Sequence, residues 1–371
     1  MKDNGRLMVN TSRREFFRGA LGVGLVSAVS GVSRAAGLES GASMPMALGP
    51  VVTDWEIRRA KSLNGRKAAM YIDDTIWIFR DLTRQRPKSM FDHPLLGALK
   101  EAHERYGLKL QFNCFYRTDM FYGMDEFSLA DMTDAYKSEW QASKDWLRLG
   151  FHAYQEFPDY PFINAEYSDM ATAFDRIHGE ISRFAGEEVF TYALVAHWLP
   201  VSRDGCRLLK ERGVKLIAST DGARFAYVGD RSALPYGHAF RVESNRKKET
   251  ALYRRSAYDP ALLSSACAYN HLMTDQADMT WGTFAHVYDR SLGIGFKRFR
   301  NGPMLNLCTP ARVRDEMNAA SGSELLCIGN HEQYFHKEYF AWQPDYAEKV
   351  LVAAKMAHDA GRDFIFMEDT M

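Results

Sequence analysis

Short apolar runs alternate along the chain with segments in which apolar residues recur every three or four positions. The first run, residues 68–72, is followed by a helical pattern at 94–106, and Gly107 lies where a C-cap glycine belongs. Strand–helix alternation of this kind predicts a parallel α/β fold. Further strands are expected at 108–115, 149–152, 190–196, 214–218, 304–307, 325–328 and 364–367, and further helices at 129–147, 170–184, 203–212, 310–320 and 346–360.

This alternation favours an irregular parallel (β/α) barrel of seven or eight strands over residues 65–371. A doubly wound open sheet is the alternative, although no glycine-rich phosphate-binding fingerprint follows the first strand. Residues 221–302 mix hairpin-like pieces with loops and are predicted to be a partly irregular insertion. Residues 37–64 contain Gly, Ser and Pro without periodicity, which predicts a linker or surface arm.

The N-terminal residues 1–36 have the pattern of a twin-arginine export signal. Arg13 and Arg14 stand beside Phe16 and Phe17, ahead of a weakly apolar run at 20–32 and a small-residue exit. This run is shorter than the roughly 20 residues that a membrane-spanning helix needs. We therefore expect the protein to engage the twin-arginine translocase, to be periplasmic or secreted, and to keep no stable membrane span after processing.

Charge and cysteine content narrow the functional classes. The chain has 47 basic and 47 acidic residues, so its net charge gives no reason to expect nucleic-acid binding. Its five cysteines are far apart and lack a Cys-x-x-Cys spacing, which favours buried thiols with at most one disulfide over a cysteine metal site. No haem, iron–sulfur or dinucleotide motif supports an oxidoreductase.

Ionisable residues gather at the predicted strand ends. In parallel α/β barrels these ends meet at one mouth, where functional side chains collect. The ends carry Asp73 and Asp74, His152, His197 with Trp198, and His331 with Glu332.

Residue type suggests a role for each of these groups. Neighbouring carboxylates at a strand end point different ways, so one of Asp73 and Asp74 could bind a metal while the other acts as a base. His152 and Glu156, four residues apart, could share a metal on one helical turn. A late histidine such as His331 can protonate a leaving group or complete a metal shell. Each group also has a structural interpretation, as a turn cap or a hydrogen-bonded core residue.

Residues 71–75, Tyr-Ile-Asp-Asp-Thr, resemble the opening Asp-Asp motif of polysaccharide deacetylases, the family 4 carbohydrate esterases with NodB homology. The resemblance implies that Asp73 is the general base and that Asp74 binds a divalent metal, commonly zinc. It also places His152 on the first of two metal-binding histidines and Glu156 on the second. His331 corresponds to the histidine that serves the leaving group.

The resemblance extends over roughly residues 66–370 as short motifs, with three departures. Thr75 stands where the family has glycine, and Glu156 supplies an oxygen ligand in place of a second imidazole. His197 and Trp198 stand where an arginine of the substrate cleft is expected. This pattern is similar to that of a divergent relative, whose fold carries over better than its reaction.

Three functions remain open from the sequence. The first is a metal-dependent hydrolase that removes acetyl groups from a polysaccharide or oligosaccharide, with Asp74, His152 and Glu156 on the metal. Asp73, His331 and Glu332 would then be its catalytic residues. Candidate substrate-binding residues are Trp77, Tyr116, Tyr154, His197, Trp198 and Tyr334.

The second function is a glycan hydrolase or lyase on the same barrel. Its acids would come from Asp73, Asp74, Glu156 and Glu332, and Tyr116, Tyr154 or Tyr334 could serve in a lyase. The third is a non-catalytic carbohydrate-binding protein that keeps the barrel without its chemistry.

Overall fold

Residues 54–118, 126–157, 160–163, 165–219, 269–276, 282–299, 301–339 and 342–371 are described by the computed structural model of this chain. All belong to the second of two units, Ala47–Met371. The predicted export signal, most of the predicted linker and most of the predicted insertion lie outside these residues. No helix among the described residues is long and apolar enough to cross a membrane.

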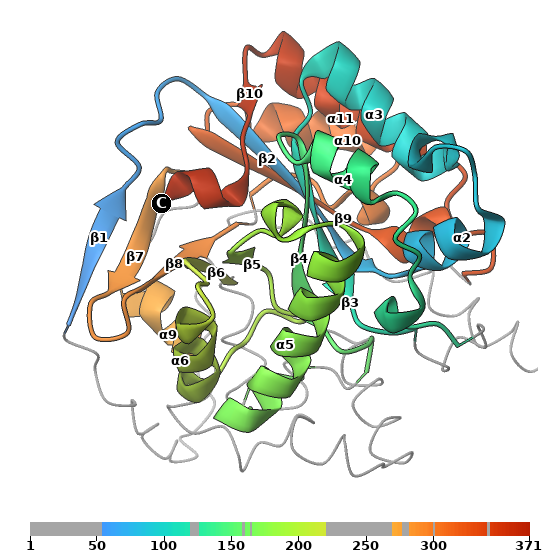
Figure 1. Ribbon diagram of the computed structural model, residues 1–371. Coiled ribbons are helices and arrows are strands. Elements are labelled where there is room, and N and C mark those ends of the chain that lie inside the picture. Colours follow the sequence, from blue (N-terminus) through green and yellow to red (C-terminus); the bar gives the residue numbers. More distant parts are fainter. Residues whose placement is uncertain are drawn as a thin grey trace, which may run out of the picture. The chain divides into compact units, whose positions relative to one another are not determined.

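One sheet is entirely parallel and carries the strands predicted with the clearest apolar runs. Its central strand β2 (Lys67–Thr75) pairs on one side with β9 (Leu325–His331). On the other side it pairs with β3 (Leu110–Phe115), and β3 pairs with β4 (Leu147–Ala153). The short β10 (Asp363–Phe364) lies beside the beginning of β2 (Figure 1).

The second sheet mixes parallel and antiparallel pairs in the order β1-β7-β8-β6-β5. Strands β5 (Ala193–Leu194), β6 (Leu216–Ser219) and β8 (Ile294–Arg298) are parallel. Strands β7 (Ala285–Asp289) and β1 (Trp55–Arg59) add to its far edge in antiparallel pairing. Strands β7 and β8 fall within the range predicted as an insertion, and β1 within the range predicted as a linker.

Isolated parallel bridges extend the first sheet at both edges. Leu149 on β4 pairs with Phe190, which precedes β5, and Gly329 on β9 pairs with Met304. Parallel neighbours therefore run from the Met304 segment through the first sheet toward β5, β6 and β8. The described residues show no pairing between β8 and the Met304 segment, so closure into a barrel is not shown. The strand predicted at 304–307 is wrong, because the chain turns there into the 3-10 helix η7 (Leu305–Leu307).

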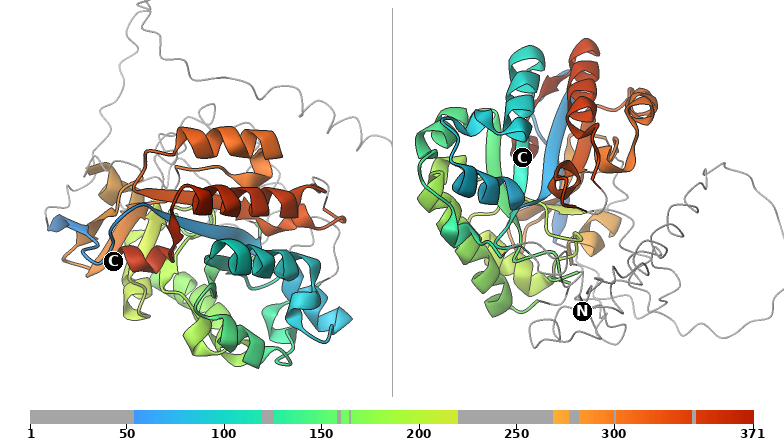
Figure 2. Two further views of the ribbon diagram at one scale, coloured as in Figure 1. Left: turned by 90° about the horizontal axis from the view of Figure 1, so that it is seen from above. Right: turned by 90° about the vertical axis from the view of Figure 1, so that its right-hand side faces the viewer.

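Helices cover the outer side of the first sheet. The predicted helix at 94–106 forms as α3 (Pro94–Tyr106), and Gly107 ends it in the left-handed conformation, φ 68°. Helix α3 packs beside α11 (Tyr346–Asp359), as Figure 2 shows. The remaining α-helices are α2 (Trp77–Gln85), α4 (Lys137–Ser143), α5 (Tyr167–Phe184), α6 (Arg203–Glu211), α9 (Tyr269–Gln276) and α10 (Pro310–Ala319). The remaining 3-10 helices are η1 (Met90–Asp92), η3 (Leu129–Asp131), η4 (Glu187–Val189), η8 (Glu332–Phe335) and η9 (Met367–Thr370).

Strand β2 is buried on both faces, and its alternation sets the direction of the side chains that follow. Met70 and Ile72 join the larger apolar cluster under the helices, whereas Ala69 and Tyr71 join a smaller cluster between the two sheets. Because side chains alternate along a strand, Asp73 follows Tyr71 onto the inner face. The sheet pattern therefore delivers a carboxylate to the interior at the C-terminal end of β2.

The cysteines have the burial that the sequence predicts. Four of them are buried and free, namely Cys114, Cys206, Cys308 and Cys327. Cys267 lies outside the described residues.

Candidate metal-binding active site

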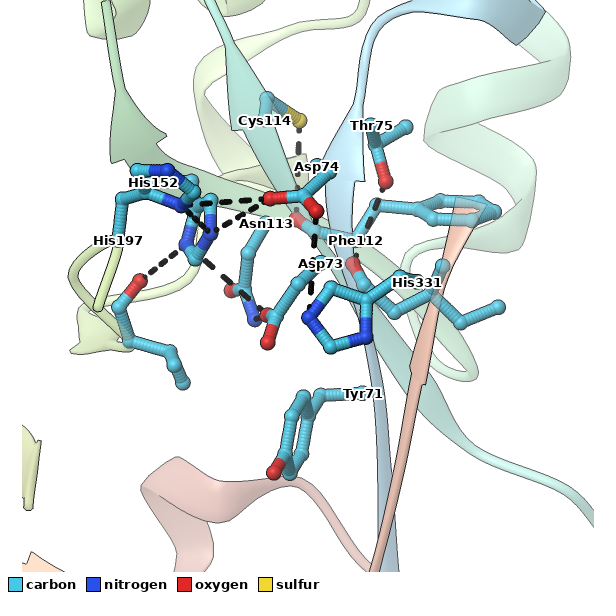
Figure 3. Close-up of polar contacts among 12 residues, drawn as sticks. Tyr71, Asp73, Asp74, Thr75, Phe112, Asn113, Cys114, His152, His197 and His331 are labelled. Atoms are coloured by element: carbon cyan, nitrogen blue, oxygen red, sulfur yellow. Dashed lines mark hydrogen bonds and ion pairs between the residues drawn. The ribbon is translucent and has the colours of Figure 1, made fainter. Parts of the chain in front are cut away.

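The two aspartates stand where β2 leaves the regular sheet. Its pairing with β3 shifts register between Ile72 and Thr75, and Asp74 has a left-handed backbone, φ 60°. A residue other than glycine is strained in this conformation, and such strain clusters at functional sites. The turn separates the carboxylates, so that Asp73 faces Asn113 while Asp74 faces His152 (Figure 3).

Asp74, His152 and His197 form the group that could hold a metal ion. One ligand atom from each lies within 4.8 Å of the others. Asp74 Oδ1 is 3.1 Å from His152 Nε2 and 3.4 Å from His197 Nδ1, and these two nitrogens are 3.1 Å apart. All three residues are buried. The ends of three different strands or their extensions, β2, β4 and β5, therefore meet at one point.

The far side of each imidazole fixes its tautomer. His152 Nδ1 lies 2.6 Å from the carbonyl of Val195, and His197 Nε2 lies 2.8 Å from the carbonyl of Glu156. A carbonyl oxygen only accepts, so each of these nitrogens carries the proton and donates. The lone pairs of His152 Nε2 and His197 Nδ1 then face each other beside a carboxylate oxygen. Three electron-rich atoms aimed at one point fit a divalent cation.

The two aspartates have opposite pKa shifts. Burial raises the pKa of Asp73, and the neighbouring Asp74 charge raises it further against the lowering influence of His152. Burial also acts to raise the pKa of Asp74, but the His331 charge and the hydrogen bonds of the other histidines outweigh it and hold this pKa well below its usual value. Titratable neighbours with separated pKa values divide naturally into a base and a permanent anion.

The pKa of His197 shows that protons compete for the same group. Burial lowers this pKa, yet the hydrogen bond and charge of Asp74 outweigh burial, so that it is raised overall. A proton on Nδ1 would occupy the lone pair that a metal needs. Metal binding at such a site releases protons and weakens as the pH falls.

Asp73 is held by amides from the interior of the sheet. Asn113 Nδ2 donates to Asp73 Oδ1 at 2.6 Å, and Gln111 Nε2 donates to Asn113 Oδ1 at 2.8 Å. His152 Nδ1 is 4.0 Å from the same aspartate oxygen. Asp73 thus lies beside the metal group without belonging to it.

The end of β9 contributes His331 and Gln333. His331 Nε2 lies 3.9 Å from Asp74 Oδ2, and its Nδ1 lies 3.1 Å from Asn306 Oδ1. Its side chain is 29% exposed, against 3% for His152 and 6% for His197. Gln333 Nε2 donates to Asp74 Oδ2 at 2.6 Å and so orients the carboxylate. His331 is the imidazole at this site that solvent or a substrate can reach.

The structure puts His197, rather than Glu156, beside Asp74 and His152. The expected Glu156 ligand relied on a helical turn after His152, but β4 continues to Ala153 and bends follow. Glu156 instead contributes its main-chain carbonyl, which accepts from His197. The group that could hold a metal ion thus has two imidazoles and one carboxylate among the described residues.

Glu332 points away from the metal group, contrary to its expected catalytic role. It is fully buried, and its carboxylate accepts the main-chain N–H groups of Ile76, Trp77 and Ile78 at 2.7, 2.9 and 2.5 Å. A carboxylate at this position neutralises the unpaired donors at the start of α2. Side-chain alternation explains the correction, because the residue after His331 leaves on the other side of the strand.

Two of the aromatic candidates lie close to the metal group. The ring of Trp198 is 5.6 Å from that of His197, and Trp198 also has a left-handed backbone, φ 59°. The ring of Tyr334 is 6.3 Å from that of His331. Trp77 differs from both, because it is buried and packs edge-on against His336. Its position is that of a core residue rather than of a substrate contact.

Tyr116 and Tyr154 follow the ends of β3 and β4 and stack on each other, with ring centres 5.0 Å apart. Both are half-buried. The sequence interpretation gave no role to Asn113 or Gln333, which hold the two aspartates. The available signal for Asn113 was a polar residue inside the apolar run at 108–115.

Comparisons with known proteins do not identify a family for this chain. No family model matches the chain, and no curated protein matches it. The chain is similar to the solved structure of a T48 deacetylase with substrate, at 9% identity and a TM-score of 0.34, over 82% of this chain and 90% of that one. It is also similar to a family 4 carbohydrate esterase from Streptomyces lividans in complex with acetate, at 12% identity and a TM-score of 0.32, over 82% of this chain and 92% of that one. Likenesses at these TM-scores decide neither fold nor function.

Proposed function

We propose that this protein is a metal-dependent hydrolase that removes acetyl groups from a polysaccharide. One observation carries the proposal: two imidazole lone pairs and the Asp74 carboxylate converge on one point, with Asp73 beside them. The motif at residues 71–75 links this arrangement to carbohydrate deacetylation, because it resembles the opening motif of that family.

Two nitrogens and one oxygen form a ligand set that suits zinc. Asp74, His152 and His197 would hold the ion, and three protein ligands leave a coordination position open, which is typical of catalytic rather than structural zinc. When bound, such an ion lowers the pKa of a water molecule and polarises an acyl carbonyl. Gln333 and the carbonyls of Val195 and Glu156 fix the three ligands from behind.

The remaining groups supply the proton transfers. Asp73 accepts the proton of the attacking water, because its carboxylate lies beside the metal group without belonging to it. Asn113 keeps its carboxylate in place. His331 donates a proton to the departing amine or alcohol, since it is the histidine open to the outside and Asn306 holds its other nitrogen.

The arrangement is less suited to glycosidic-bond cleavage. A carboxylate pair on either side of a glycosidic bond needs two acids that face the substrate. Glu332 is fully buried beneath α2, and Asp74 faces the histidines instead. The non-catalytic interpretation does not account for the orientation of the imidazole lone pairs.

Metal content and acetate release test the proposal together. The purified chain is expected to contain one divalent ion per molecule, and to release acetate from acetylated chito- or xylo-oligosaccharides without shortening them. Asp73→Asn should keep the ion and lose turnover. Shortened or unsaturated products, or sugar binding without turnover that Asp73→Asn leaves unchanged, would contradict the proposal.

We also propose export by the twin-arginine route, on the basis of residues 1–36. Replacing both Arg13 and Arg14 by lysine should retain the protein in the cytoplasm, as cell fractionation would show. Unchanged export of this double variant would contradict the assignment.

A further inference from the structure

A second polar cluster lies where β3 and β4 end, and it consists of Tyr116, Arg117, Tyr154 and Arg176. Parallel pairing continues beyond the strands here: Tyr116 N–H donates to the carbonyl of Ala153 at 3.1 Å, and Arg117 N–H donates to that of Tyr154 at 3.0 Å. The two tyrosine rings stack at 5.0 Å with planes 20° apart. We call these four residues the arginine–tyrosine cluster.

Both arginines gather on the same ring. The guanidinium carbon lies 5.3 Å from the ring centre of Tyr154 for Arg117 and 5.7 Å for Arg176. Arg176 Nη1 also donates to the Tyr154 hydroxyl at 3.3 Å. Arg176 reaches the cluster from α5, which packs on β4 (Figure 1). The cluster is therefore built from three segments of the chain rather than from one loop.

The Arg117 guanidinium is held in place through its inner nitrogen. Arg117 Nε donates to Gln155 Oε1 at 2.6 Å, and Gln155 Nε2 donates to the carbonyl of Phe157 at 2.7 Å. The terminal nitrogens of Arg117, Nη1 and Nη2, make no hydrogen bond within the described residues. Arg117 is half-buried and Arg176 is exposed, so both remain open to a ligand.

Neither arginine has a carboxylate partner in the part of the chain that the structure describes. Arg212, which follows α6, by contrast donates to both oxygens of Asp175 at 2.7 and 2.9 Å. Both guanidinium groups lie on one ring, so an anion that contacts both would be attracted by two positive charges. The planar fork of arginine matches a carboxylate in shape and charge.

The cluster borders the candidate active site. Tyr154 comes two residues after His152. Phe115, which precedes Tyr116, places its ring 5.3 Å from His152 and 5.0 Å from His197. We propose that the arginine–tyrosine cluster binds the carboxylate of an acidic sugar, so that the glycan substrate contains a uronic acid. Deacetylation of this glycan rests on the proposed function, whereas binding of the acidic sugar does not.

Binding of trigalacturonate and of its methyl ester tests this inference, because esterification removes the charge and keeps the rings. The full chain is expected to bind the acid at least tenfold more tightly by calorimetry. Arg117→Met and Arg176→Met should each weaken binding of the acid about tenfold, the size of one charge-assisted hydrogen bond, and leave binding of the ester unchanged. Unchanged metal content and circular dichroism would show that the variants fold.

Arg105→Met is the matched control. Arg105 also lies over a tyrosine ring, 4.9 Å from the centre of Tyr106, but it already has Glu101 as a carboxylate partner. Binding of trigalacturonate should not change in this variant. Three results would overturn the carboxylate assignment. They are equal affinity for acid and ester, equal binding of the acid by all three arginine variants, and tighter binding of a sulfated trisaccharide.

The same experiment separates the two proposals. His197→Ala should stop turnover and keep arginine-dependent binding of trigalacturonate. Arginine-dependent binding without acetate release from any glycan would refute the deacetylase and support the acidic-sugar site. Unchanged acetate release in Arg117→Met and Arg176→Met, on acidic and on neutral glycans alike, would support the deacetylase and refute the acidic-sugar site.

Discussion

The chain holds two clusters of histidines and carboxylates, and their hydrogen bonds are arranged in opposite ways. In the metal group, His152 and His197 turn their N–H groups outward to main-chain carbonyls and their lone pairs inward to Asp74. Every inward atom is an electron donor. Three electron-rich atoms therefore share one point, which a divalent cation or a proton on His197 Nδ1 can join.

The second cluster is balanced by its own atoms. His336 places Nε2 3.2 Å from Glu332 Oε1 and Nδ1 3.6 Å from Asp81 Oδ2, so both of its nitrogens face carboxylates. Glu332 receives three main-chain N–H groups at the start of α2, and Arg80 lies 2.8 Å from Asp81. The carboxylates of this cluster face donors of the chain itself, while His93 Nδ1 is left without a hydrogen-bond partner among the described residues.

The comparison shows that composition does not distinguish a metal site from a structural network. Both clusters contain two histidines and at least one carboxylate, since His93 joins the second through Asp81 at 3.6 Å. What differs is the partner of the second ring nitrogen. A carbonyl behind the ring fixes a lone pair in front of it, whereas a carboxylate on each side uses both nitrogens.

The largest expected effect is in the metal group. His197→Ala should abolish stoichiometric metal binding and lower kcat/KM for acetate release by at least about a thousandfold, because two ligands and an open water position hold the ion poorly. Elemental analysis of the purified variant and acetate assays would measure both. His336→Gln, in the balanced cluster, should keep the metal.

Glu156→Gln sharpens the same test. Glu156 contributes its main-chain carbonyl to His197, and glutamine keeps that carbonyl, so full metal content is expected. Loss of the ion in Glu156→Gln, together with its retention in His197→Ala, would mean that Glu156 is the third ligand, as expected from the sequence. The contrast drawn between the two clusters would then fail.

Asp73→Asn should have the next largest effect. Its loss as general base is expected to lower kcat by about a hundredfold to ten-thousandfold, while the ion stays bound, because Asp73 lies beside the metal group and not in it. Steady-state kinetics with metal analysis would separate these quantities. Loss of the ion in this variant would mean that Asp73 is itself a ligand.

The sequence predicted the strands of the parallel sheet together with β5 and β6, and it missed β1, β7 and β8. Apolar runs located β2, β3, β4 and β9 because these parallel strands are buried on both faces. Strand β1 escaped prediction because its Trp55–Arg59 sequence is mostly exposed and carries little apolar pattern. Its pairing partner β7 lies far along the chain, so no local signal could reveal the contact.

The strand-end rule predicted most residues of the candidate site, but not their hydrogen-bond partners. The structure places His152 and His331 3.1 and 3.9 Å from Asp74, at strand ends where the rule expected them. The choice of His197 over Glu156 depends on how the chain bends after Ala153. Which nitrogen of His152 is free depends on the carbonyl of Val195. Both depend on tertiary contacts that residue spacing does not contain.

In the balanced cluster, Glu332→Gln should affect stability rather than chemistry. Glutamine offers one accepting oxygen and turns an amide toward main-chain N–H donors, so the free energy of unfolding should fall by about 3 kcal/mol. Urea unfolding in the presence of a chelator would measure it without a contribution from metal. Glu316→Gln is the control, since half-buried Glu316 pairs with exposed Arg312 on α10 and should matter by roughly 0.5 kcal/mol or less. Similar losses in both variants would show that the Glu332 cap does not stabilise α2.

The smallest expected effect concerns Asp81 and acid pH. Burial acts to raise the pKa of Asp81, but the hydrogen bond from His93 and the Arg80 charge outweigh it and lower this pKa. A lowered pKa means that the folded state favours the charged carboxylate, so its contribution is present above the unfolded pKa near 4 and disappears as the pH falls through the folded value. Asp81→Asn should therefore cost about 1 kcal/mol at pH 7, and the difference from the wild-type chain should shrink below about pH 4. Urea titrations at several pH values, with chelator and with the exposed Asp359→Asn as control, would follow it. If the difference in unfolding free energy between the two chains stays constant down to pH 3, Asp81 acts through packing rather than charge. Glu332 would then be the carboxylate of the second cluster whose charge stabilises the fold.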